Sequence, residues 1–318
     1  MKYTHQITIQ VKKYLRLFVF ALCLFISSGI FAQKIVFTVM ALKGYAKLDD
    51  VSLKIGAKLK NNQTLKIDTD TYLCLVTTDQ QVLEITTAGT YVVKELMSKV
   101  PPRKGLNASY VEFVVSEVTK ATEDGISAKN RFQHMNKTGA VKRSMNEVVS
   151  FFLSSIKADN GHILYGDILD LAWEVKQPTG FDTIRRFQVS VLHLNGMSVF
   201  SKVVGSPEIS IDLSKVNLKN QDGFTVQVVP LDNKGKYWSK NDIYKLYINL
   251  LDASQKQQIS EKISAGSTAI DKLMNAQYFE SEKLFPDAIH AYKDAIRLSE
   301  GNPIYEDLFY RFWLRNMK

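Results

Sequence analysis

The chain has 318 residues, of which 45% are hydrophobic and 23% are charged. This balance is ordinary for globular proteins and excludes a chain dominated by disorder. The length exceeds what one hydrophobic core usually organises, so we expect several domains. The formal charge is +9, but no dense stripe of Lys and Arg interleaved with aromatic residues occurs, which argues against a nucleic-acid partner.

Residues 1–32 have the three parts of a secretory signal peptide. A basic stretch without acidic residues ends at Arg16, an apolar run spans residues 17–26, and small residues lead to Ala32. The apolar run is shorter than the roughly 20 residues of a membrane-spanning helix. We therefore predict cleavage after Ala32 and export to the periplasm or the cell surface, with an uncleaved membrane anchor as the alternative. Loss of this segment lowers the charge to +5.

The two cysteines point to neither a lipid anchor nor a disulfide. Cys23 follows Leu22, whereas a lipidation site needs a small residue before the thiol. Cleavage after Ala32 would leave Cys74 as the only cysteine of the mature chain, and it lies in an apolar run. We expect Cys74 to be a buried small hydrophobic residue rather than a reactive thiol.

Residues 33–100 alternate between short strand-like runs and turn formers. The runs are rich in β-branched and aromatic residues, and they predict a small all-β roll or sandwich. They lie at residues 35–40, 45–48, 65–67, 72–77, 81–86 and 90–93.

The order of residues in this part resembles the FecR-like domain, in which a glycine, a "leucine, two residues, glycine" step and a strand pair recur. The resemblance implies a periplasmic module. The chain departs from the family at Asp79-Gln80-Gln81, where Asp-Gly is usual, so the hairpin turn is expected to differ. The matching residues are Gly44-Tyr45-Ala46, Leu53-Lys54-Ile55-Gly56, Leu59, Leu65-Lys66-Ile67-Asp68-Thr69, residues 72–76 and Val82-Leu83-Glu84-Ile85.

Residues 101–157 read as a helical connector that begins at the break Pro101-Pro102. The apolar residues within 109–122 have helical spacing, although their β-branched content leaves a strand possible. A second helix is predicted over residues 144–156, with Phe151 and Phe152 on its buried face.

Residues 158–250 return to alternation, which predicts a β-sandwich. Strands are expected at residues 168–175, 186–194, 198–204, 208–213 and 224–229. A Trp near the middle of an early strand, in Leu171-Ala172-Trp173, resembles the immunoglobulin-like and fibronectin type III domains. The run from Phe224 to Gly235 then reads as the penultimate strand and its turn. The resemblance implies that Trp173 belongs to the core.

Residues 251–318 have a helical period, and their pattern is the most specific in the chain. Ala276, Phe279, Ala288, Tyr292 and Ala295 stand at intervals of 3, 9, 4 and 3, which resembles a tetratricopeptide repeat. The small residues let two antiparallel helices approach closely, and the aromatic residues fill the space beside them.

A single repeat cannot bury its own apolar face, so further helices are expected around it. Residues 251–263 predict one helix upstream, and an aromatic stripe over residues 305–313 predicts another downstream. The stripe either closes a four-helix unit or leaves an exposed patch of Tyr310, Trp313 and Leu314 that docks another protein. Four candidate partner-binding residues follow from the second hypothesis: Tyr278, Tyr310, Trp313 and Arg315.

No motif indicates an enzyme. The sequence has no His-Glu-x-x-His, paired Cys-x-x-Cys, phosphate loop or Gly-x-Ser-x-Gly elbow, so no catalytic residue, metal or cofactor is predicted. The histidines of the mature chain are scattered, and we expect them on the surface. They are His134, His162, His193 and His290.

The modules together resemble exported proteins of the Bacteroidetes type. The leading hypothesis is a non-catalytic scaffold or adaptor of the cell envelope that binds another envelope protein through its helical tail. The alternative is an envelope protein that binds anionic polysaccharide or peptidoglycan through its β modules, with Tyr91 or Trp238 contributing. A hydrolase assembled from distant residues is the third possibility.

Overall fold

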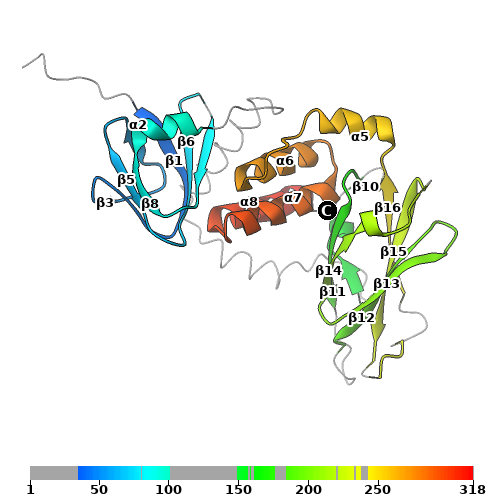
Figure 1. The fold of residues 1–318 in the computed structure, drawn as a ribbon. Coiled ribbons are helices and arrows are strands. Elements are labelled where there is room, and N and C mark those ends of the chain that lie inside the picture. Colours follow the sequence, from blue (N-terminus) through cyan, green and yellow to red (C-terminus); the bar gives the residue numbers. More distant parts are fainter. Residues whose placement is uncertain are drawn as a thin grey trace, which may run out of the picture.

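The computed structural model describes residues 35–79, 81–100, 149–156, 158, 161–175, 184–219, 221–232, 234–237 and 243–317. The chain is a multidomain β plus α protein, as the sequence predicts. We call its parts the β-roll (residues 35–100), the sandwich (149–250) and the helical module (253–317). The helical module lies between the β-roll and the sandwich (Figure 1). The predicted signal peptide, the predicted helix over 109–122, His134 and Trp238 fall outside the described residues.

The β-roll consists of two four-stranded sheets, with strand orders β4-β1-β6-β7 and β3-β2-β5-β8. Strand β6 is buried along its whole length, and Cys74 within it is a free, fully buried thiol, as expected. The sequence did not predict β3 and β4, because both are short and mostly polar. The strands are β1 Ile35–Lys43, β2 Ala46–Leu48, β3 Val51–Ser52, β4 Lys58–Lys60, β5 Thr64–Ile67, β6 Tyr72–Thr77, β7 Val82–Ile85 and β8 Gly89–Val92. Helix α2 Val93–Leu96 and a 3-10 turn, Met97–Lys99, follow.

The sandwich pairs a five-stranded sheet, β10-β16-β15-β12-β13, with a three-stranded sheet, β14-β11-β9. Trp173 on β11 is 1% exposed and packs edge-on against Phe151 and Phe187, which confirms its prediction as a core residue. Strand β15 is the penultimate strand of the described sandwich, also as predicted. The strands are β9 Val149–Phe151, β10 His162–Leu164, β11 Ile168–Val175, β12 Arg186–Leu192, β13 Ser198–Val204, β14 Glu208–Asp212, β15 Gly223–Leu231 and β16 Tyr244–Leu250.

The helix predicted over residues 144–156 is wrong for the part that the structure describes. Val149–Phe151 form β9, which pairs antiparallel with β11 and places Phe151 opposite Trp173. A short 3-10 turn, Leu153–Ser155, follows it. The apolar residues fit both a helical and a strand period, and the free edge of β11 decides between them. These residues therefore belong to the sandwich sheet and not to a helical connector.

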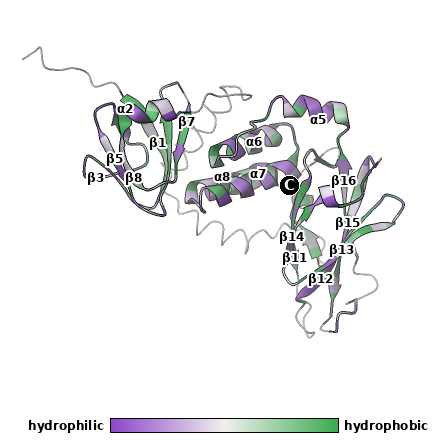
Figure 2. Cartoon of the chain, viewed as in Figure 1, coloured by the Kyte–Doolittle hydropathy of each residue, from purple (hydrophilic) through white to green (hydrophobic). Residues whose placement is uncertain are grey.

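The helical module confirms the helix hairpin predicted from the repeat pattern. It comprises α5 Ala253–Ser260, α6 Ala269–Ser281, α7 Phe285–Leu298 and α8 Pro303–Asn316. Ala276, Ala288 and Ala295 are fully buried, as close helix approach requires. Pro286 lies in the first turn of α7, and Gly301 adopts a φ of 71° just before α8. Both α7 and α8 carry hydrophilic and hydrophobic residues, as expected for helices that face a core on one side (Figure 2).

Among the described residues, none of the helices has the length and apolar character needed to cross a membrane.

Candidate functional site

Trp313 lies inside the chain. Its side chain is 7% exposed, and its ring packs against Phe309 and Phe312 on the same helix. Phe152 of the sandwich covers it from the other side, with ring centroids 6.4 Å apart. The interpretation of Trp313 as part of an exposed patch is therefore wrong, because the aromatic stripe of α8 closes the helical module against the sandwich.

Tyr278 is also buried, beside Phe279 on α6. Phe279 in turn packs on Tyr165 of the sandwich at 5.7 Å between ring centroids. The structure thus places Tyr278 and Trp313 in the packing of the module, where neither side chain offers a free surface.

Tyr310, Leu314 and Arg315 lie toward the outside of α8. Tyr310 is half-buried, Arg315 is exposed, and Leu314 is 58% exposed. We call these three residues the α8 outer face. They include two of the four predicted partner-binding residues, and their role in binding stays a prediction.

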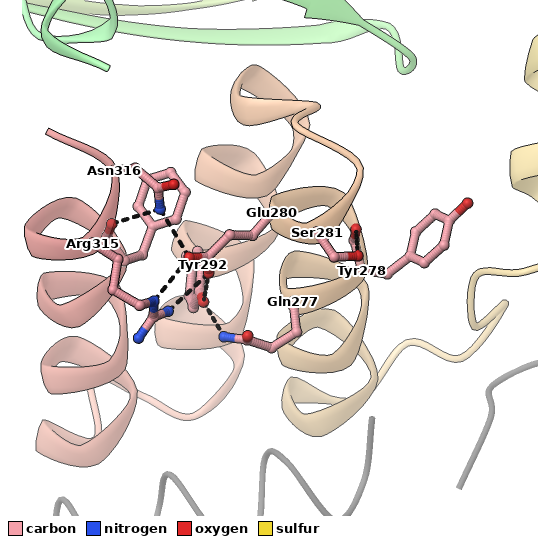
Figure 3. A network of polar contacts seen from close by, with 8 residues as sticks. Gln277, Tyr278, Glu280, Ser281, Tyr292, Arg315 and Asn316 are labelled. Atoms are coloured by element: carbon pink, nitrogen blue, oxygen red, sulfur yellow. Dashed lines mark hydrogen bonds and ion pairs between the residues drawn. The ribbon is translucent and has the colours of Figure 1, made fainter. Parts of the chain in front are cut away.

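Arg315 fixes one end of this face by a bidentate ion pair. Its Nε and Nη2 atoms donate to the two carboxylate oxygens of Glu280 on α6, at 2.9 and 2.8 Å. Asn316 Nδ2 and the hydroxyl of Tyr292 also donate to Glu280, and Gln277 bonds to the same hydroxyl (Figure 3). Helices α6, α7 and α8 thus meet at one carboxylate, which orients the C-terminal turn.

Replacing Arg315 with Ala is expected to lower the free energy of unfolding by only about 1 kcal/mol, since the guanidinium is partly solvated. Urea unfolding monitored by circular dichroism measures this. Lys256→Ala on α5 is the control, because Lys256 makes no ion pair with any residue that the structure describes. This substitution should change the free energy of unfolding by less than about 0.5 kcal/mol. A loss above about 3 kcal/mol for Arg315→Ala would contradict the picture of a half-exposed pair.

A carboxylate of the β-roll caps the helical module. Glu84 on β7 accepts hydrogen bonds from the backbone N–H groups of Ala269 at 3.1 Å and Ile270 at 2.7 Å, the first residues of α6. A helix N-terminus favours a negative charge, because its first N–H groups lack partners within the helix. Burial raises the pKa of Glu84, and these two N–H groups partly oppose the rise. The contact ties the β-roll to α6.

Two tyrosines join the same modules beside Glu84. The hydroxyls of Tyr72 on β6 and Tyr305 on α8 lie 2.7 Å apart, and both side chains are fully enclosed. Burial raises the pKa of both phenols and of the neighbouring Cys74 thiol. All three groups are therefore neutral near pH 7, which suits structural rather than nucleophilic roles.

A second carboxylate, which is buried, joins the helical module to the sandwich. Asp287 on α7 is 5% exposed and accepts from the backbone N–H groups of Tyr165 at 2.8 Å and Gly166 at 2.7 Å. A Cβ atom at Gly166 would lie 3.0 Å from Asp287 Oδ1, so glycine allows this close approach. Burial raises the pKa of Asp287 to about 6, against the opposing effect of the two hydrogen bonds.

One turn further along α7, His290 Nδ1 lies 2.6 Å from a carboxylate oxygen of Asp170 on β11. This hydrogen bond raises the pKa of His290, and burial opposes it. His162 and His193 are buried, so the expectation of surface histidines is wrong for these two. His193 is held in the sandwich by a 2.7 Å bond to the carbonyl of Asn217.

The docking roles of Glu84 and Asp287 could not be predicted from local patterns, because each side chain accepts from the backbone of a segment more than 100 residues away. Glu84 lies in a run that resembles the FecR-like domain, but that resemblance gives it no role, and Asp287 belongs to no motif. The pairing of each carboxylate with backbone N–H groups of another module becomes visible only when the modules are docked.

For the alternative of glycan binding, Tyr91 is half-buried, its hydroxyl donates to the carbonyl of Thr87, and Lys99 lies over its ring. Within the described ranges, no group of three or more His, Cys, Asp or Glu side chains is arranged to hold a metal ion. A shallow hollow of about 480 Å³ lies in the β-roll, lined by residues that include Leu48, Val51 and Leu53.

The sequence matches no protein-family model, and no curated protein is significantly similar to it.

Proposed function

We propose that the chain is a non-catalytic scaffold of the bacterial cell envelope. The helical module holds the β-roll and the sandwich in a fixed relation and presents the α8 outer face to another envelope protein. The observation that carries this proposal is the position of the helical module between two β modules, with a carboxylate contact on each side, from the half-buried Glu84 and the buried Asp287.

The contacts support a rigid arrangement for an energetic reason. A carboxylate withdrawn from water is costly unless hydrogen bonds compensate it. The half-buried Glu84 and the buried Asp287 each receive two backbone donors from the neighbouring module. Separating the modules would leave these donors to water and would expose the aromatic residues packed around them. The α8 outer face supports the partner-binding part, since Leu314 and Tyr310 put apolar surface beside the charged Arg315.

Photo-crosslinking in native cells tests the proposal. A crosslinking amino acid at position 314 is expected to yield an adduct with one defined envelope protein. The matched control is the same amino acid at position 281, which is exposed on α6 of the same module. Equal adducts from both positions, or none from position 314, would remove the support for the α8 outer face.

A sedimentation assay with the purified full-length protein distinguishes the glycan-binding alternative from the scaffold proposal. Co-sedimentation with insoluble peptidoglycan at low salt, weakened by high salt, would favour that alternative over a protein partner. The scaffold proposal expects the protein to stay in the supernatant.

A further inference from the structure

Two titratable groups lie at the contact between α7 and the sandwich, and they are joined to different parts of it. Asp287 receives the N–H groups of the turn between β10 and β11, and His290 pairs with Asp170 on β11. Both contacts exist only while α7 is docked, since each joins residues about 120 positions apart. The protonation state of these groups is therefore linked to docking.

We propose that the contact between the helical module and the sandwich is a proton-linked clasp, which takes up protons at Asp287 and His290 as it closes and holds more tightly in mild acid. This goes beyond the scaffold function. It also rests on the docked arrangement that the scaffold proposal uses.

The sign for Asp287 follows from its burial. The docked carboxyl has a pKa of about 6, compared with 3.8 for a solvated aspartate. The docked state therefore binds a proton more readily than the open state, and docking strengthens as the pH falls through 6 toward 3.8. Between pH 8 and pH 4.5 this one group changes the docking equilibrium by about 20-fold to 30-fold.

His290 acts in the same direction at higher pH. Its pKa is raised in the docked state, chiefly by the hydrogen bond to Asp170. The resulting stabilisation is fully present below the ordinary histidine value of 6.5 and is lost as the pH rises through the raised value. The two groups together therefore make docking weaken continuously from mild acid to mild alkali.

The surrounding charges leave this direction intact. On α7, Asp294 lies 3.7 Å from His290 Nε2 and raises the pKa of the imidazole, while Lys293 faces Asp170. On the sandwich side, Asp167 lies near Tyr165. Burial raises the pKa of Asp170, but the hydrogen bond from His290 and the charge of Lys293 outweigh it and lower the pKa below 3.8. Asp170 therefore opposes docking in acid only below about pH 4.

Hydrogen exchange of the Tyr165 and Gly166 amides, measured by NMR on the full-length protein, reports docking directly, because these amides donate to Asp287. After correction for the intrinsic exchange rate, their protection factors are expected to rise at least 20-fold from pH 8 to pH 4.5. Amides of β12 serve as the internal reference for global opening.

Two conservative variants separate the two groups. As the pH falls, the protection factors of Asp287→Asn are expected to rise only in the range above about pH 6. Those of His290→Gln are expected to rise only in the range below about pH 6. Asp70→Asn is the matched control, since Asp70 is an exposed turn residue of the β-roll with a φ of 57° that asparagine adopts readily. The wild-type measurement needs no variant, so a variant that fails to fold leaves the test intact.

Protection that is normal but independent of pH between 8 and 4.5 would overturn the clasp and leave the scaffold proposal standing. Absence of protection at every pH would overturn both. Protection factors that rise as much in Asp287→Asn or in His290→Gln as in the wild type would also overturn the assignment of the clasp to these residues.

Discussion

Replacing Trp313 with Ala is expected to lower the free energy of unfolding by about 3–5 kcal/mol, the usual cost of removing a large aromatic side chain from a packed core. Trp313 packs against Phe309, Phe312 and Phe152, so its loss opens a cavity where the helical module meets the sandwich. Phe309 and Phe312 are held on α8 and Phe152 directly follows β9, so the three rings can only partly fill the space. Urea unfolding monitored by circular dichroism measures the change.

The adjacent residue provides the control for this prediction. Leu314 is 58% exposed, so Leu314→Ala should change the free energy of unfolding by less than about 0.5 kcal/mol. The pair therefore separates the two interpretations of the α8 stripe. If Trp313→Ala were neutral in stability and abolished partner crosslinking, Trp313 would belong to a binding surface and not to the contact with Phe152.

Local periodicity predicted most of the elements, because the residues that define them are close in sequence. The repeat spacing placed Ala276, Ala288 and Tyr292 on two facing helices, and all three are fully buried. The alternation around Trp173 likewise predicted a core strand. In each case the local period and the tertiary environment favour the same structure.

The errors arise where a distant segment decides the outcome. Val149–Phe151 have a period compatible with a helix, but pairing with β11 makes them a strand. Trp is a residue type enriched at protein interfaces, but Trp313 is covered by Phe152, which lies 161 positions earlier. Exposure of an aromatic residue depends on the relative placement of modules, and a single sequence gives no measure of that placement.

The exposure of the candidate binding residues likewise depends on how the modules are placed. Of the four predicted partner-binding residues, only Tyr310 and Arg315 lie toward the outside, and nothing in the local pattern separates them from Tyr278 and Trp313. The two carboxylates that dock the modules had no sequence signature, because the groups that they bind are backbone N–H donors.

Replacing Glu84 with Ala is expected to weaken the attachment of the β-roll by about 1–3 kcal/mol, since the first N–H groups of α6 would lose their acceptor in a largely enclosed place. Glu84→Gln should cost less, because the amide oxygen still accepts one hydrogen bond and the buried charge is removed. Hydrogen exchange of the Ala269 and Ile270 amides measures the attachment locally, and urea unfolding measures it globally.

Helix α6 carries the matched control for this change at its other end. Glu282 is exposed at the C-terminal end of α6, where a negative charge is slightly unfavourable, so Glu282→Ala should be neutral or stabilising by less than about 0.5 kcal/mol. Because burial raises the pKa of Glu84, the wild-type attachment should also weaken as the pH rises through that raised value, and Glu84→Gln should remove this dependence. If the pH dependence of the attachment persisted in Glu84→Gln, another titratable group would be responsible for it. Unchanged exchange at Ala269 and Ile270 in Glu84→Ala would mean that apolar packing around Tyr72 and Tyr305 alone attaches the β-roll to the helical module.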